Sequence, residues 1–205
     1  MVKGQTKVLR LGSVSSTQDV ARDMPVGSIV VAQHQDAGRG RAGRRWEAPA
    51  SSALLVSFVL MPNPVLSLAA GVAAAEACGA GVRLKWPNDL LLDGRKLGGI
   101  LVEATASKAV CGIGINLTSA PDGAARLDQP ADELLVRLTE RLGFWCSAPA
   151  ETVLNRWRDL SVTLGRRVRV DLPGRSFEGL AEDIGAGGEL IVDGRPVSAG
   201  SVTHL

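Results

Sequence analysis

Three segments of the sequence contain the residue types needed to hold anions. The first is Gly38-Arg39-Gly40-Arg41-Ala42-Gly43-Arg44-Arg45-Trp46. Glycines let backbone amides turn toward an anion, and arginines add charge and fork-shaped donors. The loop therefore predicts a polyphosphate site, although taken alone it equally suits a solvated basic loop or an RNA-binding tract. Because it lies between two expected strands, it is less typical of the linkers that carry disordered arginine tracts.

The second segment is Lys85-Trp86-Pro87-Asn88-Asp89, followed by Lys96-Leu97-Gly98-Gly99-Ile100. Two lysines and one carboxylate flank an expected hairpin here, and a plain Trp–Pro turn with an Asp-capped corner is the alternative. The third segment is Gly112-Ile113-Gly114-Ile115-Asn116. Glycines inside a strand indicate either the close approach of another group or simple backbone crowding.

Alternating strand and helix patterns surround these segments and must position them. A short helix capped by Ser15, Ser16 or Thr17 is expected before the turn at Pro25 and Gly27. An Asp93-Gly94 pair favours a tight hairpin turn. Strands are expected at residues 7–11, 28–33, 53–61, 82–85, 90–92, 96–102 and 109–116, and further helices at 66–78, 131–142 and 152–160.

The composition changes near Leu164. Four short strands separated by glycine turns are expected after it, at residues 167–172, 177–184, 189–193 and 195–198. About 40 residues of small antiparallel strands predict a compact SH3-like barrel. The sequence therefore predicts two domains, residues 1–162 and 163–205.

The overall composition excludes several classes of protein. With 23 Lys plus Arg against 21 Asp plus Glu, the net charge of +2 does not suit DNA binding through bulk charge. Three dispersed cysteines and two histidines predict neither a disulfide framework nor a zinc site, which suits a reducing cytoplasm. The first residues lack the apolar core of a signal peptide, and the longest apolar run, 53–61, is shorter than the roughly 20 residues that span a bilayer.

Taken together, and in this order, the motifs resemble the biotin–protein ligase family. The matching stretches are Ser16-Thr17, Gln35 before the GRGRAGRRW loop, KWPNDLL, KLGGILVE and GIGIN. The resemblance runs from about residue 8 to the end of the chain. It implies an α+β fold, with a mixed-sheet catalytic domain of the biotin/lipoate ligase type and a small C-terminal SH3-like β-barrel.

The resemblance also implies an activity and its site. The activity is ATP-dependent formation of biotinyl-5'-AMP and pyrophosphate, followed by transfer of biotin to a lysine, with Mg²⁺ expected on the ATP phosphates and no protein metal ligand assigned. The implied catalytic residues are Lys96, Arg39, Arg41 and Asp89. The implied biotin-binding residues are Ser16, Thr17, Gln18, Gln35, Gly38, Arg39, Gly40, Arg41 and Lys96. The implied adenylate-binding residues are Arg39, Arg41, Arg44, Trp46, Lys85, Asn88, Lys96 and Asn116.

The chain departs from the family in two places and leaves two alternatives. The family often has Asn where this chain has Gln18. The family's usual Asn two residues after GIGIN is replaced by Thr118, and the segment 118–130 is short, which concerns the far wall of the nucleotide site. The expected partner is the biotin carboxyl carrier domain of a carboxylase, with no DNA and no membrane, since only about 15 residues precede the Ser-Thr motif and a DNA-binding domain needs several helices. The alternatives are a lipoate–protein ligase, which shares the fold and adenylate chemistry, and an RNA-binding module. The second alternative predicts more aromatic residues than the 3% present, none of them tyrosine.

Overall fold

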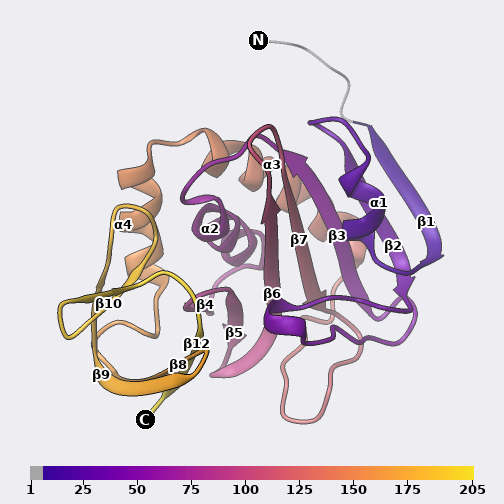
Figure 1. Ribbon diagram of the computed structural model, residues 1–205. Coiled ribbons are helices and arrows are strands. Elements are labelled where there is room, and N and C mark those ends of the chain that lie inside the picture. Colours follow the sequence, from indigo (N-terminus) through magenta and orange to yellow (C-terminus); the bar gives the residue numbers. More distant parts are fainter. Residues whose placement is uncertain (1–6) are drawn as a thin grey trace. The chain divides into compact units, whose positions relative to one another are not determined.

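The computed structural model describes residues 7–205 of the chain (Figure 1). The elements are β1 (Val8–Val14), α1 (Thr17–Arg22), β2 (Ile29–Gln35), the 3₁₀ turn η1 (Arg41–Gly43), β3 (Ala53–Leu60), α2 (Leu66–Cys78), β4 (Val82–Lys85), β5 (Asp89–Leu92), β6 (Arg95–Ala104), β7 (Ala109–Asn116), α3 (Ala131–Ser147), α4 (Ala150–Leu160), β8 (Arg167–Leu172), β9 (Arg175–Ile184), β10 (Leu190–Val192), β11 (Arg195–Val197) and β12 (Ser201–His204). These elements form two compact units, each built from two separate stretches of sequence. The first unit runs to Asn63 and resumes at Leu92–Arg137, and the second comprises Pro64–Leu91 and Leu138–Leu205.

The first unit contains a mixed sheet with the strand order β1-β2-β3-β7-β6. Strands β1 and β2 are parallel, whereas the β2–β3, β3–β7 and β6–β7 pairs are antiparallel. Helix α1 forms the crossover between the two parallel strands and lies on one face of the sheet (Figure 1). Its Ala21 packs with Val30, Val59 and Val110 of the sheet, so the short helix is fixed by its apolar face.

The second unit contains α2, which is apolar on all sides. Ten of its thirteen residues are buried, as expected of a helix packed within a core. Glu76 is the one charged residue of this helix. Its carboxylate accepts hydrogen bonds from Trp145 Nε1 and Arg156 Nε, both at 2.9 Å. These bonds join α2 to α3 and to α4.

The C-terminal part of the second unit is a five-stranded antiparallel sheet of the SH3-like type, with the order β11-β10-β9-β8-β12. Buried Val168 and Val170 alternate with exposed Arg167 and Arg169 along β8, which is the period-two pattern of a half-buried strand. Strand β12 was not predicted from the sequence. All four residues of β12 pair with residues of β8.

The two domains predicted at residues 1–162 and 163–205 follow the change in composition, whereas the compact units follow contacts. The two criteria describe different properties, and the boundary at residue 162 stays a prediction. Among the described residues, no helix has the length and apolar character needed to cross a bilayer.

Candidate active site

A buried polar cluster occupies the start of α1. Ser16 is the N-cap residue, and its hydroxyl accepts a hydrogen bond from the Gln18 backbone N–H at 3.3 Å. Ser16, Thr17 and Gln18 are each 3% exposed or less. Most buried polar side chains are hydrogen-bonded, so this cluster needs partners from other elements.

Those partners come from β2 and β3. The carbonyl oxygen of the Gln35 side chain accepts from the Thr17 backbone N–H at 2.7 Å and from the Thr17 hydroxyl at 3.0 Å. The Ser57 hydroxyl lies 2.8 Å from Thr17 Oγ1 and 3.0 Å from Gln18 Oε1, and it is fully buried. A hydroxyl has one proton, so Ser57 donates to one of these two oxygens at a time.

Sequence reasoning missed Ser57. In the sequence, Ser57 is a single polar residue in the middle of the apolar run of β3. Such a residue indicates only a buried strand, unless its hydrogen-bond partners are known. Those partners are 39 and 40 residues away in the sequence.

The arginine loop closes on itself as a small hairpin. Arg39 and Arg45 form an isolated antiparallel bridge, and the Gly40 N–H donates to the Arg44 carbonyl at 2.7 Å. Gly38 is required for close approach, because a Cβ there would lie 2.3 Å from the Trp46 carbonyl oxygen and 3.0 Å from Gln35 Nε2. The glycine therefore brings the loop against the side chain of Gln35.

Two glycines of β7 leave room for site side chains. A Cβ at Gly112 would lie 3.0 Å from the Gln18 amide, and a Cβ at Gly114 would lie 2.6 to 3.0 Å from atoms of the Trp46 indole. Of the two explanations open for the GIGIN glycines, the structure therefore supports close approach of another group.

Lys96 and Asn116 are brought together through Ala125. The Asn116 side-chain N–H donates to the Ala125 carbonyl at 3.0 Å, and the Ala125 N–H donates to the Lys96 carbonyl at 2.8 Å. Asn116 is buried, whereas Lys96 is exposed on β6.

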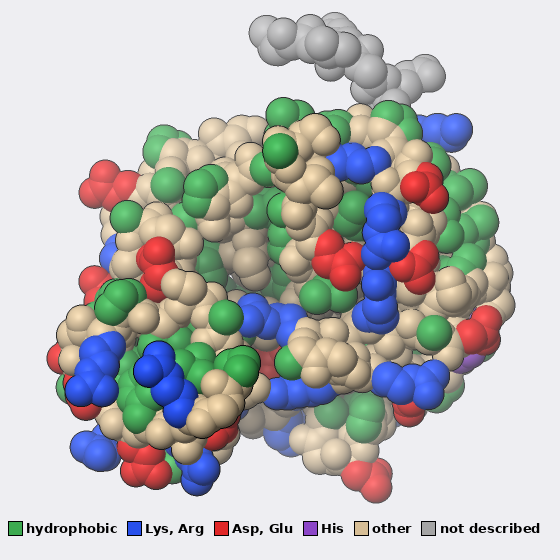
Figure 2. All heavy atoms as spheres, in the orientation of Figure 1, with side chains coloured by type: hydrophobic (Ala, Val, Ile, Leu, Met, Phe, Trp, Pro, Cys, Tyr) green, Lys and Arg blue, Asp and Glu red, His purple; other side chains and the backbone are tan. Residues whose placement is uncertain are grey.

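Arg39 and Arg45 of the loop are paired with carboxylates. Arg39 lies 2.8 Å from Asp19 and 3.3 Å from Glu103, and Arg45 lies 3.5 Å from Glu47. Acidic side chains flank a line of basic ones on this face of the first unit (Figure 2). The arginine loop therefore contributes fixed cations as well as backbone donors.

Two N–H groups of this loop are buried without a hydrogen-bond partner: Arg39 Nε and Trp46 Nε1. A buried donor left unpaired costs about 1–3 kcal/mol. Both groups therefore suit a ligand that supplies oxygen or nitrogen acceptors to the loop. In residues 7–205 no group of three or more His, Cys, Asp or Glu side chains is arranged to hold a metal ion.

Of the other predicted site residues, Arg41 is half-buried in η1 and Arg44 is exposed at its end. Lys85, Asn88 and Asp89 lie in the second unit and are half-buried. Trp86 anchors this segment within that unit. It is 2% exposed, its backbone N–H donates to Thr163 Oγ1 at 3.0 Å, and its indole N–H donates to the Gly188 carbonyl at 3.1 Å. The Trp–Pro turn is therefore held at two points by residues of the C-terminal sheet and the segment leading into it.

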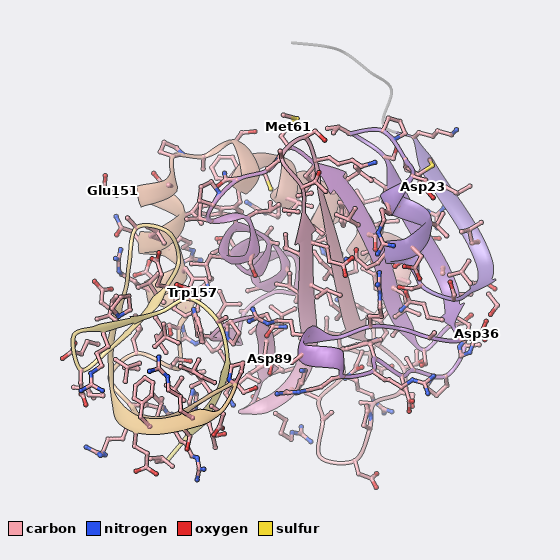
Figure 3. All side chains as sticks on the ribbon, in the orientation of Figure 1. Asp23, Asp36, Met61, Asp89, Glu151 and Trp157 are labelled. Carbon is pink, nitrogen blue, oxygen red and sulfur yellow. The ribbon has the colours of Figure 1, made fainter. Side chains whose placement is uncertain are left out.

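An open hollow of about 440 Å³ lies at the end of β2 in the first unit. Asp36, labelled in Figure 3, follows the last residue of β2 and is one of its lining residues. His34, Gln35, Arg45 and Glu47 also line it. The hollow shares Gln35 with the predicted biotin-binding residues, but its lining contains neither the hydroxyls of the α1 cluster nor Trp46.

Comparison with known sequences decides the family. The sequence model of the biotin/lipoate A/B protein ligase family matches residues 11–118, more than half of the chain. The chain belongs to this family. A second model, the biotin protein ligase C terminal domain, matches residues 163–205, which include β8 to β12.

Individual members of the family agree over most of the chain. The biotin–[acetyl-CoA-carboxylase] ligase of Mycobacterium tuberculosis is 37% identical over 98% of this chain and 86% of its own length. The bifunctional ligase/repressor BirA of Bacillus subtilis is 30% identical over 88% of this chain and 67% of its own length. Among solved structures, the biotin protein ligase from Aquifex aeolicus in complex with biotin and ATP superposes with a TM-score of 0.82, at 26% identity, over 97% of this chain and 98% of that chain. These likenesses confirm the predicted fold class.

Proposed function

We propose that the protein is an ATP-dependent biotin–protein ligase that forms biotinyl-5'-AMP and transfers biotin to a lysine of a carrier domain. The observation that carries the proposal is the contact between two features: the buried polar cluster of α1 and the arginine loop, which meet at Gly38 and Gln35. The family and the relatives named above support the same activity.

The polar cluster suits the ureido ring of biotin. That ring has one carbonyl and two N–H groups, and the cluster offers hydroxyls and side-chain amides from Ser16, Thr17, Gln18 and Gln35. Biotin has a carboxylate at the end of its aliphatic chain. Placing the ring in the cluster would direct that carboxylate toward the loop.

The arginine loop suits the first half-reaction. A carboxylate oxygen of biotin attacks the α-phosphorus of ATP, a P–O bond forms, and the bond to the β-phosphate breaks to release pyrophosphate. Two anions must approach each other, so fixed cations are needed to offset their repulsion. We assign this role to Arg39, Arg41 and Lys96, and Mg²⁺ enters with the triphosphate as part of the substrate.

The nucleotide would be held by the residues that the family motifs indicate. We assign adenine stacking to Trp46, whose indole N–H has no hydrogen-bond partner, and an adenine hydrogen bond to Asn116. The family resemblance also assigns Arg44, Lys85 and Asn88 to the adenylate, and Asp89 to orienting a lysine or the incoming nucleophile. Gly38 and Gly40 let the backbone approach the ligand.

In the second half-reaction the amine of an acceptor lysine attacks the acyl carbon of the anhydride. A C–N bond forms, the C–O bond to AMP breaks, and the amine proton passes to solvent. Since AMP is a good leaving group, little further acid–base chemistry is needed. We propose a biotin carboxyl carrier domain of a carboxylase as the acceptor. The use of ATP favours the cytoplasm as the location, and none of the three cysteines forms a disulfide.

The proposal is tested by isotope exchange between ATP and pyrophosphate with the purified protein and Mg²⁺. Exchange that depends on biotin is expected, with none above background when lipoate replaces biotin. Because the family includes both kinds of ligase, lipoate-dependent exchange would instead favour a lipoate–protein ligase. Folded protein that shows no exchange with either acid would overturn the proposal.

A further inference from the structure

One carboxylate of the first unit contacts both the buried polar cluster of α1 and the arginine loop. Glu103 Oε2, on β6, accepts from Gln18 Nε2 at 3.4 Å and lies 3.3 Å from Arg39 Nη2. Gln18 belongs to α1 and Arg39 to the loop, so Glu103 links two elements of the proposed site. Glu103 is the last residue of the KLGGILVE stretch, but the sequence analysis assigned it no role.

The link depends on the length of Gln18. Its amide reaches across β7 at Gly112, where a Cβ would lie only 3.0 Å from the amide carbon. The same amide nitrogen lies 3.4 Å from the Leu101 carbonyl. Asparagine, which the family often has at this position, is one methylene shorter and would not span the same distance.

Arg39 is held by a balanced set of charges. Its Nη2 contacts Asp19 at 2.8 Å and Glu103 at 3.3 Å, and Arg22 lies 3.4 Å from each of the same two carboxylates. Two arginines and two carboxylates therefore form one ion-pair network. With Nη2 held in this way, Arg39 Nε is left buried and without a partner.

We propose that Glu103 is a positioning residue for adenylation: it fixes the Arg39 guanidinium beside the biotin cluster, with Nε–H available to the reacting anions. This inference rests on the proposed function. An arginine side chain loses much rotational freedom when it is ordered, and a carboxylate that holds it before the ligand arrives removes that cost from the binding step. Glu103 does not touch the substrates and acts through Arg39.

The contacts of Glu103 add little to the stability of the fold. The side chains of Arg39, Glu103 and Asp19 are 35%, 37% and 40% exposed, and ion pairs this exposed are screened by solvent. The substitution Glu103→Gln keeps the size of the side chain and one acceptor oxygen, and it removes the charge. We therefore expect it to alter activity far more than the melting temperature.

The experiment measures biotin-dependent ATP–pyrophosphate exchange for the wild type, Glu103→Gln, Arg39→Ala and the double variant. Glu103→Gln is expected to lower kcat/KM about tenfold, because misplacing a charged group costs rate steeply. Since Glu103 acts through Arg39, the double variant should be no slower than Arg39→Ala alone. Glu47→Gln is the matched control: this glutamate pairs with Arg45 next to the same loop, and its loss should leave kcat/KM within about twofold of wild type.

Two results would overturn the inference. One is a Glu103→Gln enzyme within about twofold of wild type. The other is a double variant slowed by the full Glu103→Gln factor beyond Arg39→Ala, because that independence indicates a general structural role. If Glu103→Gln does not fold, Glu103→Asp keeps the charge with a shorter reach, and its kcat/KM should fall less than tenfold but more than twofold. A wild-type exchange rate at background would overturn the proposed function together with this inference. If the wild type does show exchange, the results for the variants test the role of Glu103 alone.

Discussion

At the residue scale, the glycines of β7 determine how closely Gln18 and Trp46 approach the sheet. Glycine is a poor strand former, so it weakens β7 where it occurs. Here the missing side chains make room for the two groups that we assign to the biotin and adenylate pockets. The shape of the site therefore depends on the glycines, which have no side chains, as well as on the side chains that would contact the ligands.

We predict that Gly114→Ala impairs nucleotide binding. The new Cβ would lie 2.6 Å from the nearest indole atom of Trp46 and would displace the ring. Because stacking of a base on an aromatic ring is worth about 1–3 kcal/mol, the KM for ATP in the exchange assay should rise about tenfold or more. The KM for biotin should change little.

Gly12→Ala is the control for this substitution, since a Cβ at Gly12 meets nothing within 4 Å. It also replaces a strand glycine, and its KM for ATP should match that of the wild type. An unchanged KM for ATP in Gly114→Ala would show that Trp46 does not bind the base.

A second prediction concerns Lys96. A lysine ammonium is a compact charge that can bridge a carboxylate and a phosphate at once. Its loss in Lys96→Ala should lower the adenylation rate about a hundredfold, or on the order of 3 kcal/mol, with the fold intact. Steady-state exchange rates with thermal melting as the folding control test this. A rate within about threefold of wild type would assign Lys96 to the exposed hairpin surface and the catalytic cation to Lys85 or the arginine loop.

At the element scale, local pattern predicted most of the secondary structure. The bounds of α2, β4, β7 and β8 agree with those expected from the sequence. These elements have clear breakers at their ends or a continuous apolar run, and such signals are local.

Tertiary contacts explain the elements that differed. Helix α3 was predicted to end at residue 142 but continues to Ser147. Trp145, past the predicted end, is 6% exposed and donates to Glu76, so burial and a hydrogen bond extend the helix through Gly143. Strand β12 is four residues long, and its pairing with β8 cannot be recognised from so short a pattern.

The same distinction applies to the candidate site. Motifs indicated Ser16, Thr17 and Gln35, and the structure joins them in one hydrogen-bonded network. No role was predicted for Ser57 or Glu103, because their roles depend on partners far away in the chain. The catalytic and ligand-binding roles stay proposals.

The bonds of Glu76 lead to an element-scale prediction. Glu76→Ala would leave the Trp145 indole N–H and the Arg156 guanidinium without their carboxylate, in a place where the Glu76 side chain is 18% exposed. The free energy of unfolding should fall by about 1–3 kcal/mol, the usual cost of unpaired buried groups. Urea unfolding measures this change.

Glu140→Ala serves as the comparison, because Glu140 is an exposed residue of α3. Its free energy of unfolding should change by no more than about 0.5 kcal/mol. Equal stability of the Glu76→Ala and Glu140→Ala proteins would show that the carboxylate does not hold the three helices together.

At the scale of the whole molecule, the second unit contains a group that titrates in an unusual range. Burial, with help from the charges of Lys85 and Arg166, lowers the pKa of His204 from 6.5 to about 4. The ring is therefore neutral at pH 7, and its Nε2 lies 3.2 Å from the Thr163 hydroxyl, which also accepts from the Trp86 backbone N–H. A hydroxyl that accepts from Trp86 can donate its own proton to a neutral His204.

This shift predicts how stability depends on pH. Between pH 6.5 and 4 the unfolded chain binds a proton at His204 more readily than the folded protein does. The stabilising contribution of the neutral ring is thus fully present above about pH 6.5 and is lost as the pH falls toward 4. Urea unfolding of the wild type and His204→Gln at pH 7, 6 and 5 should show the wild type losing stability more steeply. Parallel pH dependences in the two proteins would contradict the assignment.

The two compact units are interleaved along the chain, and this has a consequence for synthesis. Residues Pro64–Leu91 leave the ribosome well before their partners in Leu138–Leu205, with 46 residues of the first unit made in between. At roughly 5–20 residues per second, α2 waits several seconds or longer for α4. During that time a helix with ten buried residues lacks α4, which packs against it in the folded unit. The nascent chain is then most exposed to aggregation, and a chaperone that binds apolar helices would find its target at α2.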